Sequence, residues 1–269
     1  MNTIGFVGSG NIAEALIKGI ITAGIYTPEN IFVSDIRAER LEFLTGKYGV
    51  TAVESNAELA EKVETLVLSI KPQNMTEALK SIKNAIRNNT LVISIAAGIK
   101  VAKIAAELGE MAIVRVMPNT PALIGQGASA LYANKRAKSL LKQALSIFSS
   151  VGTAVVVDNE DLIDAVTAVS GSGPAYYFLL MEEMVKAGVK LGLPEKVAKD
   201  LVLQTANGAG LLAVEADKNN ESPAELRRKV TSPGGTTEAA LKILAANNFS
   251  RLITDALTAA CNRSKELSG

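Results

Sequence analysis

The chain has 269 residues, 48% of them apolar, and its 28 basic and 27 acidic side chains leave a formal charge of +1. This length suits two domains, and this apolar fraction supports a sizeable core, which excludes a disordered chain. The balanced charge and the absence of tryptophan argue against a nucleic-acid partner, because such surfaces are basic and interleaved with aromatic residues.

The sequence shows no signal for export or membrane insertion. Met1 is followed almost at once by an apolar strand pattern, without the basic segment and cleavage site of a signal peptide. No apolar run approaches the ~20 residues of a membrane helix. The single cysteine, Cys261, can form no intrachain disulfide, which suits a reducing compartment. We therefore expect a cytoplasmic protein with no membrane partner.

The chain contains no histidine, which limits its possible chemistry. Catalytic triads, Cys–His pairs and histidine acid–base catalysis all need an imidazole. Because there is also only one cysteine, the usual zinc sites are excluded and we expect no metal. Hydride transfer fits, since a nicotinamide cofactor carries the reactivity and the protein mainly supplies position.

The first half of the chain alternates short, β-branched apolar runs with helical patterns. Such runs are typical of parallel strands that are covered on both faces of a sheet. The expected strands are 3–7, 31–35, 65–70, 90–95 and 112–117. The expected helices are 11–23, 38–47, 57–62, 74–87 and 100–108. This alternation predicts an α/β fold with a Rossmann-type, doubly wound parallel sheet.

The strand signal ends in the middle of the chain. Edge strands are expected at 129–132 and 152–157, with a helix at 135–149 between them. The helical patterns that follow are 174–190, 195–216, 222–230, 237–246 and 248–267. We therefore predict a dinucleotide-binding domain over residues 1–158 and an all-α domain over residues 159–269.

The first strand leads into a glycine-rich turn. Gly8, Gly10 and Ala13 give the spacing G-x-G-x-x-A between a strand and a helix. In dinucleotide-binding folds the first glycine permits the turn, the second admits a pyrophosphate, and the alanine lets the helix pack closely. The anion would meet free N–H groups at the helix N-terminus. An ordinary glycine turn is the alternative, which the position after the first strand disfavours.

The second strand ends in two opposite charges. Asp35 lies twenty-two residues after Ala13, about where an acid binds the adenosine ribose. Its carboxylate would bind the 2′-hydroxyl of NADH and repel the 2′-phosphate of NADPH. Arg37 would attract that phosphate, unless it is a solvated surface residue. Both NADPH and NADH therefore stay open.

Four further loops carry small or polar residues at expected strand ends or helix starts. "SIKP" (69–72) and "IAAG" (95–98) end strands, where plain turns are the alternative. "VMPNTPALIGQG" (116–127) places prolines around Asn119. "SGSGP" predicts a turn with Pro174 as the first helical residue.

"TSPGGTT" (231–237) consists of Gly, Ser and Thr around one proline, and a threonine is the expected N-cap of the next helix. Its hydroxyls and first-turn N–H groups are donors without an evident partner, which suit a small carboxylate. A bare helix cap is the alternative.

Six motifs together resemble those of the pyrroline-5-carboxylate reductases, in that family's order and over essentially the full length. They are "GSGNIA", "SIKP", "IAAG", "MPNTP", "SGSGPAY" and "TSPGGTT". The last two are specific to the family, whereas the first is shared by many dehydrogenases. The resemblance implies reduction of 1-pyrroline-5-carboxylate to proline with NADPH or NADH, the last step of proline biosynthesis. It also implies a helical dimerisation domain after the Rossmann domain, with the active site between the two.

The resemblance also implies which residues contact the cofactor and the substrate. Arg37 and Asn119, which were singled out above from the sequence itself, are added to the cofactor residues that the resemblance implies. The expected cofactor residues are then Phe6, Val7, Gly8, Ser9, Gly10, Asn11, Asp35, Arg37, Asn56, Ser69, Ile70, Lys71, Pro72, Ala96, Ala97, Gly98 and Asn119. The expected substrate-binding residues are Ser232, Gly234, Gly235, Thr236 and Ser172. The hydroxyl of Thr237 is expected at the substrate nitrogen as the catalytic group. A protonated cyclic imine accepts hydride without a strong base, which suits the absence of histidine.

Two features depart from the family. Its members vary where residues 35–37 stand, so the cofactor preference does not transfer. Many carry a histidine before the proline of the loop that here reads "NESPAEL", where this chain has Ser222. The role of that loop therefore stays open.

Other functions fit less well. A hydroxyacid dehydrogenase would carry a lysine early in the first long helix after residue 173, but the first lysine there is Lys186. A reductase of a related cyclic imine and a non-catalytic dinucleotide sensor stay open. Because residues 176–193 and 201–214 are apolar on more than one face, we expect a homodimer, with further assembly into a ring open. A self-contained helical bundle is the alternative.

Overall fold

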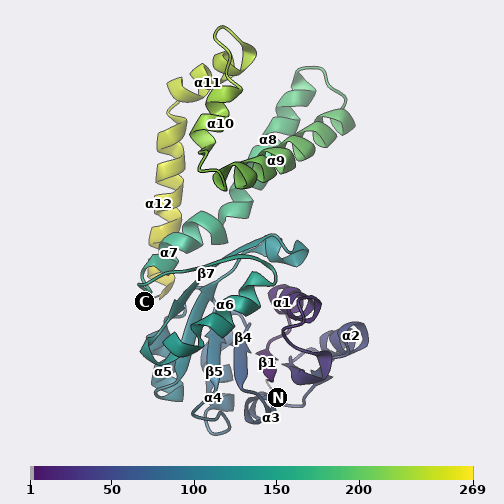
Figure 1. The fold of residues 1–269 in the computed structure, drawn as a ribbon, viewed down its shortest axis with the longest axis vertical. Coiled ribbons are helices and arrows are strands. Elements are labelled where there is room, and N and C mark those ends of the chain that lie inside the picture. The colour runs from purple at the N-terminus through teal and green to yellow at the C-terminus, as the bar shows by residue number, and fades with distance from the viewer. Residues whose placement is uncertain (1–2, 269) are drawn as a thin grey trace. The chain divides into compact units, whose positions relative to one another are not determined.

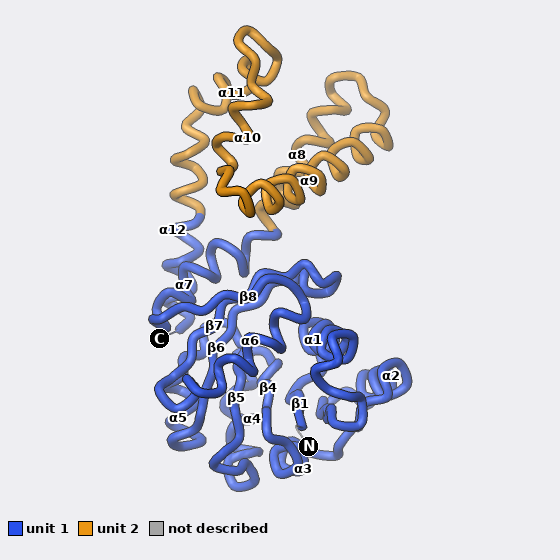
Figure 2. The backbone as a smooth tube through the Cα atoms, viewed as in Figure 1, with its two compact units in different colours: residues 1–174, 257–269 blue, residues 175–256 orange. Residues whose placement is uncertain are grey.

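The computed structural model describes residues 3–268 and contains one sheet surrounded by helices, followed by a helical region (Figure 1). It divides into two compact units, unit 1 with residues 1–174 and 257–269, and unit 2 with residues 175–256 (Figure 2).

Unit 1 extends beyond the predicted domain boundary at residue 158. The helix α7 (Leu162–Val166) packs on the last strands of the sheet. Ser264, near the end of α12 (Phe249–Ser268), donates a 2.6 Å hydrogen bond to the buried carboxylate of Asp164. The division into domains at residue 158 stays a prediction, distinct from this division into compact units.

The sheet has eight strands within the described residues, in the order β3-β2-β1-β4-β5-β6-β7-β8. They are β1 (Ile4–Val7), β2 (Ile31–Ser34), β3 (Thr51–Ala52), β4 (Thr65–Leu68), β5 (Leu91–Ser94), β6 (Ala112–Met117), β7 (Gly127–Ala133) and β8 (Gly152–Val156). All residues of β1, β4 and β5 are buried, as expected for central parallel strands that are covered on both faces. The predicted Rossmann-type α/β fold is confirmed.

Two details of the sheet differ from the prediction. The β6–β7 pair is antiparallel, whereas the other pairs among the described strands are parallel. The two strands are joined by little more than the short 3₁₀ helix η3 (Thr120–Ile124), and a parallel pair needs a longer crossover. In addition, β7 lies between β6 and β8, so of the two predicted edge strands only β8 is at an edge.

The helices of unit 1 cover both faces of the sheet (Figure 1). One buried cluster includes residues of α1, α2 and α6, and the other includes residues of α3, α4 and α5. The bounds are α1 (Asn11–Thr22), α2 (Ala38–Tyr48), α3 (Asn56–Lys62), α4 (Met75–Ile82), α5 (Val101–Leu108) and α6 (Leu141–Ser149). The remaining 3₁₀ turns are η1 (Pro28–Asn30), η2 (Pro72–Asn74) and η4 (Lys135–Leu140). The helix predicted at 74–87 thus ends at Ile82, and the one predicted at 135–149 begins with the 3₁₀ segment, which Asn134 caps.

The glycine–serine segment is helical rather than a turn. A π-helical segment, η5 (Thr167–Gly171), connects α7 to α8 (Gly173–Lys190). The Ser172 N–H donates to the Thr167 carbonyl at 2.8 Å. This is the hydrogen bond between residues i and i−5 that is typical of a π-helix, so the helical path continues through this segment. The predicted turn is therefore wrong, and Pro174 is the second residue of α8, where proline is still tolerated. Short π segments inside helices often mark functional sites.

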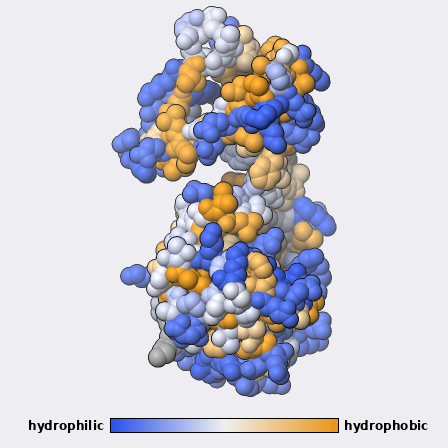
Figure 3. Space-filling model, turned by 90° about the vertical axis from the view of Figure 1, so that its right-hand side faces the viewer, coloured by the Kyte–Doolittle hydropathy of each residue, from blue (hydrophilic) through white to orange (hydrophobic). Residues whose placement is uncertain are grey.

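Unit 2 is entirely helical within its described residues. Besides most of α8 and the first part of α12, it contains α9 (Glu195–Asp217), α10 (Pro223–Lys229) and α11 (Thr236–Ala246). Ser222 begins α10 with a capping box that it forms with Glu225. Apolar side chains gather on the surface of this unit (Figure 3).

Candidate functional site

The ends of four parallel strands meet at one edge of the sheet. Val7 is in register with Ser34 of β2 and with Leu68 of β4, and Leu68 is in register with Ser94 of β5. The loops that follow these strands therefore start side by side, where doubly wound sheets bind their ligands. These loops hold the predicted cofactor residues between Gly8 and Gly98, with the exception of Asn56. Two further predicted cofactor residues, Phe6 and Val7, belong to β1 itself. The side chains of Phe6 and Val7 are buried in the core, so they can reach a ligand only through their backbone.

The two glycines of the first turn are needed for different reasons. Gly8 has a φ of +88°, and a Cβ there would lie 2.8 Å from the Ser69 carbonyl oxygen. The fold itself thus requires glycine at this position. Gly10 has a φ of −71°, and a Cβ there would meet nothing within 4 Å. Its open surroundings are the cradle that a pyrophosphate needs and a side chain would fill.

The turn is held in place by hydrogen bonds. The Gly8 N–H donates to the Ser34 carbonyl at 2.9 Å, and the Gly8 carbonyl accepts from Ser69 Oγ at 2.6 Å. The Ser9 N–H donates to Asp35 Oδ2 at 2.7 Å. The N–H groups at the start of α1 have no acceptor within the described residues, and no side chain caps the helix. They are free to bind an anion.

Asp35 and Arg37 form a two-point ion pair. Arg37 Nε and Nη2 each lie 3.0 Å from a carboxylate oxygen of Asp35, and the Arg37 N–H donates to the same group. Burial favours a higher pKa for Asp35, but the hydrogen bonds from Arg37 and Ser9 outweigh it and hold the pKa below its ordinary value. The carboxylate is thus ionised at neutral pH, and its charge is partly neutralised by the arginine.

Two predicted cofactor residues have protein partners for their side-chain amides. Asn56 accepts from Ser34 Oγ at 2.5 Å and donates to Ser81 Oγ at 3.0 Å. Asn119 donates to the Ser170 carbonyl at 3.1 Å and accepts from a backbone N–H at 2.8 Å. Both side chains therefore connect elements of unit 1, and their contact with a cofactor stays a prediction.

The segment after β5 contacts residues that the sequence did not indicate, whereas no such contact is found for the exposed residues after β4 within the described residues. Lys71 and Pro72 are exposed beyond β4, whereas Gly98 is buried with a φ of +70°. A Cβ at Gly98 would lie 3.0 Å from the carbonyl oxygen of Leu267 in α12. The carboxylate of Glu160 accepts from the Val101 N–H at 2.7 Å. These contacts join distant segments, so no local signal could reveal them.

The loop at 231–237 differs in part from its prediction. The N-cap of α11 is Gly235, without a side-chain hydrogen bond, so the expected threonine N-cap is wrong. The Gly234 N–H donates to Glu238 Oε2 at 2.8 Å, and the Gly235 N–H donates to the Ser232 carbonyl at 3.0 Å. Two of the N–H groups expected to bind a carboxylate thus already have acceptors. The first-turn N–H groups of residues 236–238 have none within the described residues.

The hydroxyl groups proposed for the substrate are accessible in their own units. Ser232 is exposed, Thr237 is half-buried at the start of α11, and Ser172 is half-buried beside the π segment. Within the described residues, none of these three hydroxyls donates to or accepts from another group by hydrogen-bond geometry. They are therefore available to a ligand.

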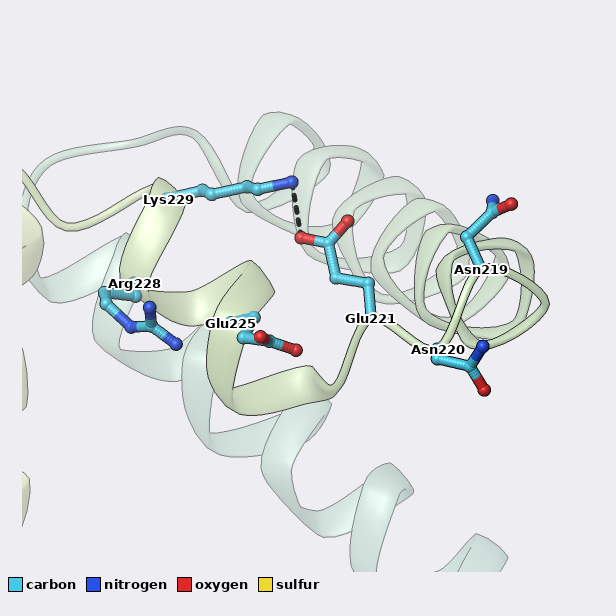
Figure 4. A pocket seen from close by; sticks show the side chains of 6 residues that line it. All are labelled: Asn219, Asn220, Glu221, Glu225, Arg228 and Lys229. Carbon is cyan, nitrogen blue, oxygen red and sulfur yellow. Dashed lines mark ion pairs between the residues drawn. The ribbon is translucent and has the colours of Figure 1, made fainter.

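A cavity of about 380 Å³ in unit 2 has a different character (Figure 4). Its lining consists of Asn219, Asn220, Glu221, Glu225, Arg228 and Lys229, none of them a predicted site residue. Lys229 Nζ lies 2.5 Å from Glu221 Oε1, although outside hydrogen-bond geometry. Glu225 is occupied by the capping box of α10. Glu221 and Lys229 thus neutralise each other, and no residue of the predicted site lines this cavity.

Two features are absent from the part of the chain that the structure describes. No group of three His, Cys, Asp or Glu side chains is arranged to hold a metal ion. No helix among these residues is long and apolar enough to span a bilayer.

Comparisons with known proteins agree over nearly the whole chain. A family model described as pyrroline-5-carboxylate reductase dimerisation matches residues 160–267, and one described as NADP oxidoreductase coenzyme F420-dependent matches residues 3–98. The pyrroline-5-carboxylate reductase of Pseudomonas aeruginosa is 48% identical over 98% of this chain and 96% of its own. That of Synechocystis is 42% identical over 98% of this chain and 97% of its own.

Solved structures give the same result. A pyrroline-5-carboxylate reductase from Coxiella burnetii has a TM-score of 0.94 and 40% identity, covering 100% of this chain and 99% of that one. A pyrroline carboxylate reductase from Plasmodium falciparum with NADP bound has a TM-score of 0.87 and 34% identity, covering 100% and 98%.

Proposed function

The chain belongs to the pyrroline-5-carboxylate reductase family, and on that premise we propose that it reduces 1-pyrroline-5-carboxylate to L-proline. The hydride comes from NADPH or NADH, and the reaction is the last step of proline biosynthesis. The observation that carries the proposal is the first glycine turn, which is held by its neighbours and leaves unpaired N–H groups at the ligand-binding edge of the sheet.

Unit 1 supplies the cofactor site. The open surface at Gly10 and the free first-turn N–H groups of α1 suit a pyrophosphate. Asp35 and Arg37 would meet the adenosine ribose and any 2′-phosphate, and residues 69–72 and 96–98 would border the nicotinamide. When bound, the nicotinamide supplies the hydride, and the chain has to orient and desolvate the reacting groups.

The loop at 231–237 supplies the substrate site. Because the Gly234 and Gly235 N–H groups have acceptors of their own, we assign the substrate carboxylate chiefly to Ser232 and the free N–H groups of residues 236–238. Gly234 has a φ of +72°, so glycine is needed to shape the loop. The Thr237 hydroxyl would face the imine nitrogen, orient it and help to deliver a proton.

The protein is a homodimer or a larger homo-oligomer, since residues 160–267 match the dimerisation segment of the family. Assembly of dimers into a ring and a cytoplasmic location are the finer parts of the proposal. The exposed apolar helices of unit 2 support a partner chain.

The proposal is tested by mixing the purified protein with 1-pyrroline-5-carboxylate and NADPH or NADH and following nicotinamide absorbance. Proline is identified by mass spectrometry. Two comparison substrates are used. One is a six-membered cyclic imine that carries a carboxylate, and the other is 1-pyrroline, which lacks the carboxylate. We expect the highest kcat/KM with 1-pyrroline-5-carboxylate and a large loss without the carboxylate. Faster reduction of the six-membered ring would favour the related cyclic-imine reductase, and nucleotide binding without reduction of any imine would indicate a sensor.

A further inference from the structure

An ion network between α1 and α2 reaches the first glycine turn. Arg40 of α2 donates from Nε to the Ser9 carbonyl at 2.5 Å and from Nη2 to a carboxylate oxygen of Glu14 in α1. Glu14 also accepts from Lys47 Nζ at 3.0 Å and from the Tyr48 hydroxyl at 2.9 Å. The side chains of Arg40 and Glu14 are each only 18% exposed. The network is therefore ordered and partly shielded from solvent.

The contact with Ser9 controls the direction of the next N–H group. No peptide bond among the described residues is cis, so the Ser9 carbonyl and the Gly10 N–H point in opposite directions. With the carbonyl held by Arg40, the Gly10 N–H faces away from α2 and has no acceptor within the described residues. Asp35 holds the N–H of Ser9 itself at 2.7 Å. Both peptide groups of Ser9 are thus fixed from outside the turn.

We propose that Arg40 is a positioning residue for the cofactor, because it holds the Ser9–Gly10 peptide with its N–H toward the pyrophosphate, and that Glu14 holds Arg40 in place. Gly10 cannot fix this peptide, since glycine has the widest backbone freedom of any residue. The proposal rests on the proposed function only in taking a dinucleotide as the ligand.

The charges of the network support this role. Burial favours a higher pKa for Glu14, but hydrogen bonds from Arg40, Lys47 and Tyr48 outweigh it and lower the pKa to about 2. Glu14 is therefore ionised throughout the working range of an enzyme. Because its carboxylate neutralises Arg40, the guanidinium serves the Ser9 carbonyl rather than acting as a free phosphate ligand.

The test compares two ligands that share the adenosine: one carries the pyrophosphate, and the other carries a 2′-phosphate in place of it. Binding of ADP-ribose, which has the pyrophosphate, and of adenosine 2′-monophosphate, which lacks it, is measured by calorimetry. We expect Arg40→Met to weaken ADP-ribose by roughly tenfold or more, as for the loss of a charge-assisted hydrogen bond, and to leave adenosine 2′-monophosphate nearly unchanged. Glu14→Gln should show a smaller loss of the same selectivity.

Lys47→Met is the matched control. It removes the other cation that contacts Glu14, and Lys47 does not touch the turn in any described contact. Both ligands should bind this variant nearly as they bind the parent. A thermal unfolding curve of each variant checks its fold. If Arg40→Met does not fold, Arg40→Lys replaces it, because a single ammonium cannot reproduce the two-direction contact of the guanidinium, and the same selective loss is expected.

Three results would overturn the proposal. Unchanged ADP-ribose binding in the Arg40 variant would show that the Ser9 contact is irrelevant to the cofactor. An equal loss for both ligands would show that Arg40 acts on the adenosine side. If Lys47→Met weakened ADP-ribose binding as much as Arg40→Met does, the loss of affinity would be a general effect of removing a positive charge. A parent protein that binds neither ADP-ribose nor NADPH would instead overturn the nucleotide site itself, which distinguishes the two failures.

Discussion

The two units bury their apolar side chains to very different extents. In unit 1 two clusters fill both faces of the sheet, and residues such as Ile4, Phe6 and Leu66 are completely buried. Among the described residues of unit 2, the buried apolar side chains are Ala198 and Ala216 alone. Ordering a chain costs conformational entropy that burial of apolar surface has to offset. Unit 1 therefore has an apolar core of its own, whereas the apolar side chains of unit 2 lack cover within the described residues.

This difference separates the proposed binding steps. The proposed cofactor residues lie on unit 1, which has its own core, and the loop proposed to bind the substrate (residues 231–237, the substrate loop) lies on unit 2. Nucleotide binding should therefore tolerate damage to unit 2, but turnover should not. Four sets of substitutions would test this separation, in decreasing order of the effect that we expect.

The largest effect is expected from charges on the apolar surface of unit 2. Leu211 and Leu212 of α9 are 58% and 56% exposed. Changing both to Asp should dissociate the oligomer and abolish activity, since an unpaired charge is costly to bury in an interface. A cost of about 3 kcal/mol already weakens association by roughly 100-fold. Light scattering gives the mass, and a Kd for NADPH near that of the parent would show that unit 1 is intact.

The control for this double substitution is Asn84→Asp, which adds a negative charge at an exposed position of unit 1. It should leave the mass and the activity unchanged. If the α9 variant remains an active oligomer, these leucines are not part of the covered surface.

Thr237→Ala tests the substrate loop without disturbing the cofactor site. The hydroxyl is expected to matter most while the imine nitrogen changes charge and geometry. Its loss should lower kcat by roughly ten- to hundredfold, which corresponds to about 1–3 kcal/mol. The Kd for NADPH should stay the same, because unit 1 is unchanged. Thr254→Ala, which removes a threonine hydroxyl from an exposed helical position of the same unit, should have little effect. Turnover of the Thr237 variant equal to that of the parent would exclude its catalytic role.

Asp35→Ser tests the cofactor preference within unit 1 alone. The substitution releases Arg37 from its two-point ion pair and removes the carboxylate that, on the proposed binding mode, would repel a 2′-phosphate. The ratio of kcat/KM for NADPH over NADH should rise by roughly tenfold, about 1.4 kcal/mol. Glu42→Ser, at an exposed position of α2, removes the same charge and should leave the ratio unchanged. An unaltered ratio in the Asp35 variant would remove this residue from the ribose site.

The smallest effect concerns the stability of unit 1. The pKa of Glu14 is about 2 in the folded chain against an ordinary value of 4.5. A lowered pKa stabilises the folded state above the unfolded pKa, and this stabilisation is lost as the pH falls from about 4.5 toward 2. Because solvent screens this surface network in part, Glu14→Gln should cost only about 1 kcal/mol at neutral pH, and the difference from the parent should shrink below pH 4.5. Urea unfolding at a fixed protein concentration measures it.

The exposed Glu42→Gln serves as the comparison for this pH profile and should follow the parent at every pH. A constant difference between the Glu14 variant and the parent over the whole range would mean that the lost stability does not come from the ionised carboxylate.

The sequence alone predicted the elements whose signal is local. The apolar runs at 3–7, 65–70 and 90–95 became buried parallel strands, and the helices after residue 173 were expected close to their observed bounds. Such signals work because the periodicity of apolar residues within one element already decides which sides are buried. The spacing of Gly8, Gly10 and Ala13 predicted the turn because the three residues lie close together in the chain, between one strand and one helix.

The contacts between residues of different elements were determined only by the tertiary structure. From the sequence, Asp35 and Arg37 were expected to have opposite effects on the cofactor preference. In the fold they form one ion pair, and Asp35 also accepts a hydrogen bond from the Ser9 N–H. The fold also brings Arg40, thirty-one residues away, to the Ser9 carbonyl. In the substrate loop, the Glu238 carboxylate takes an N–H group that the sequence left free. These contacts depend on the direction of single donors and acceptors in space, which residue type and spacing along the chain do not specify.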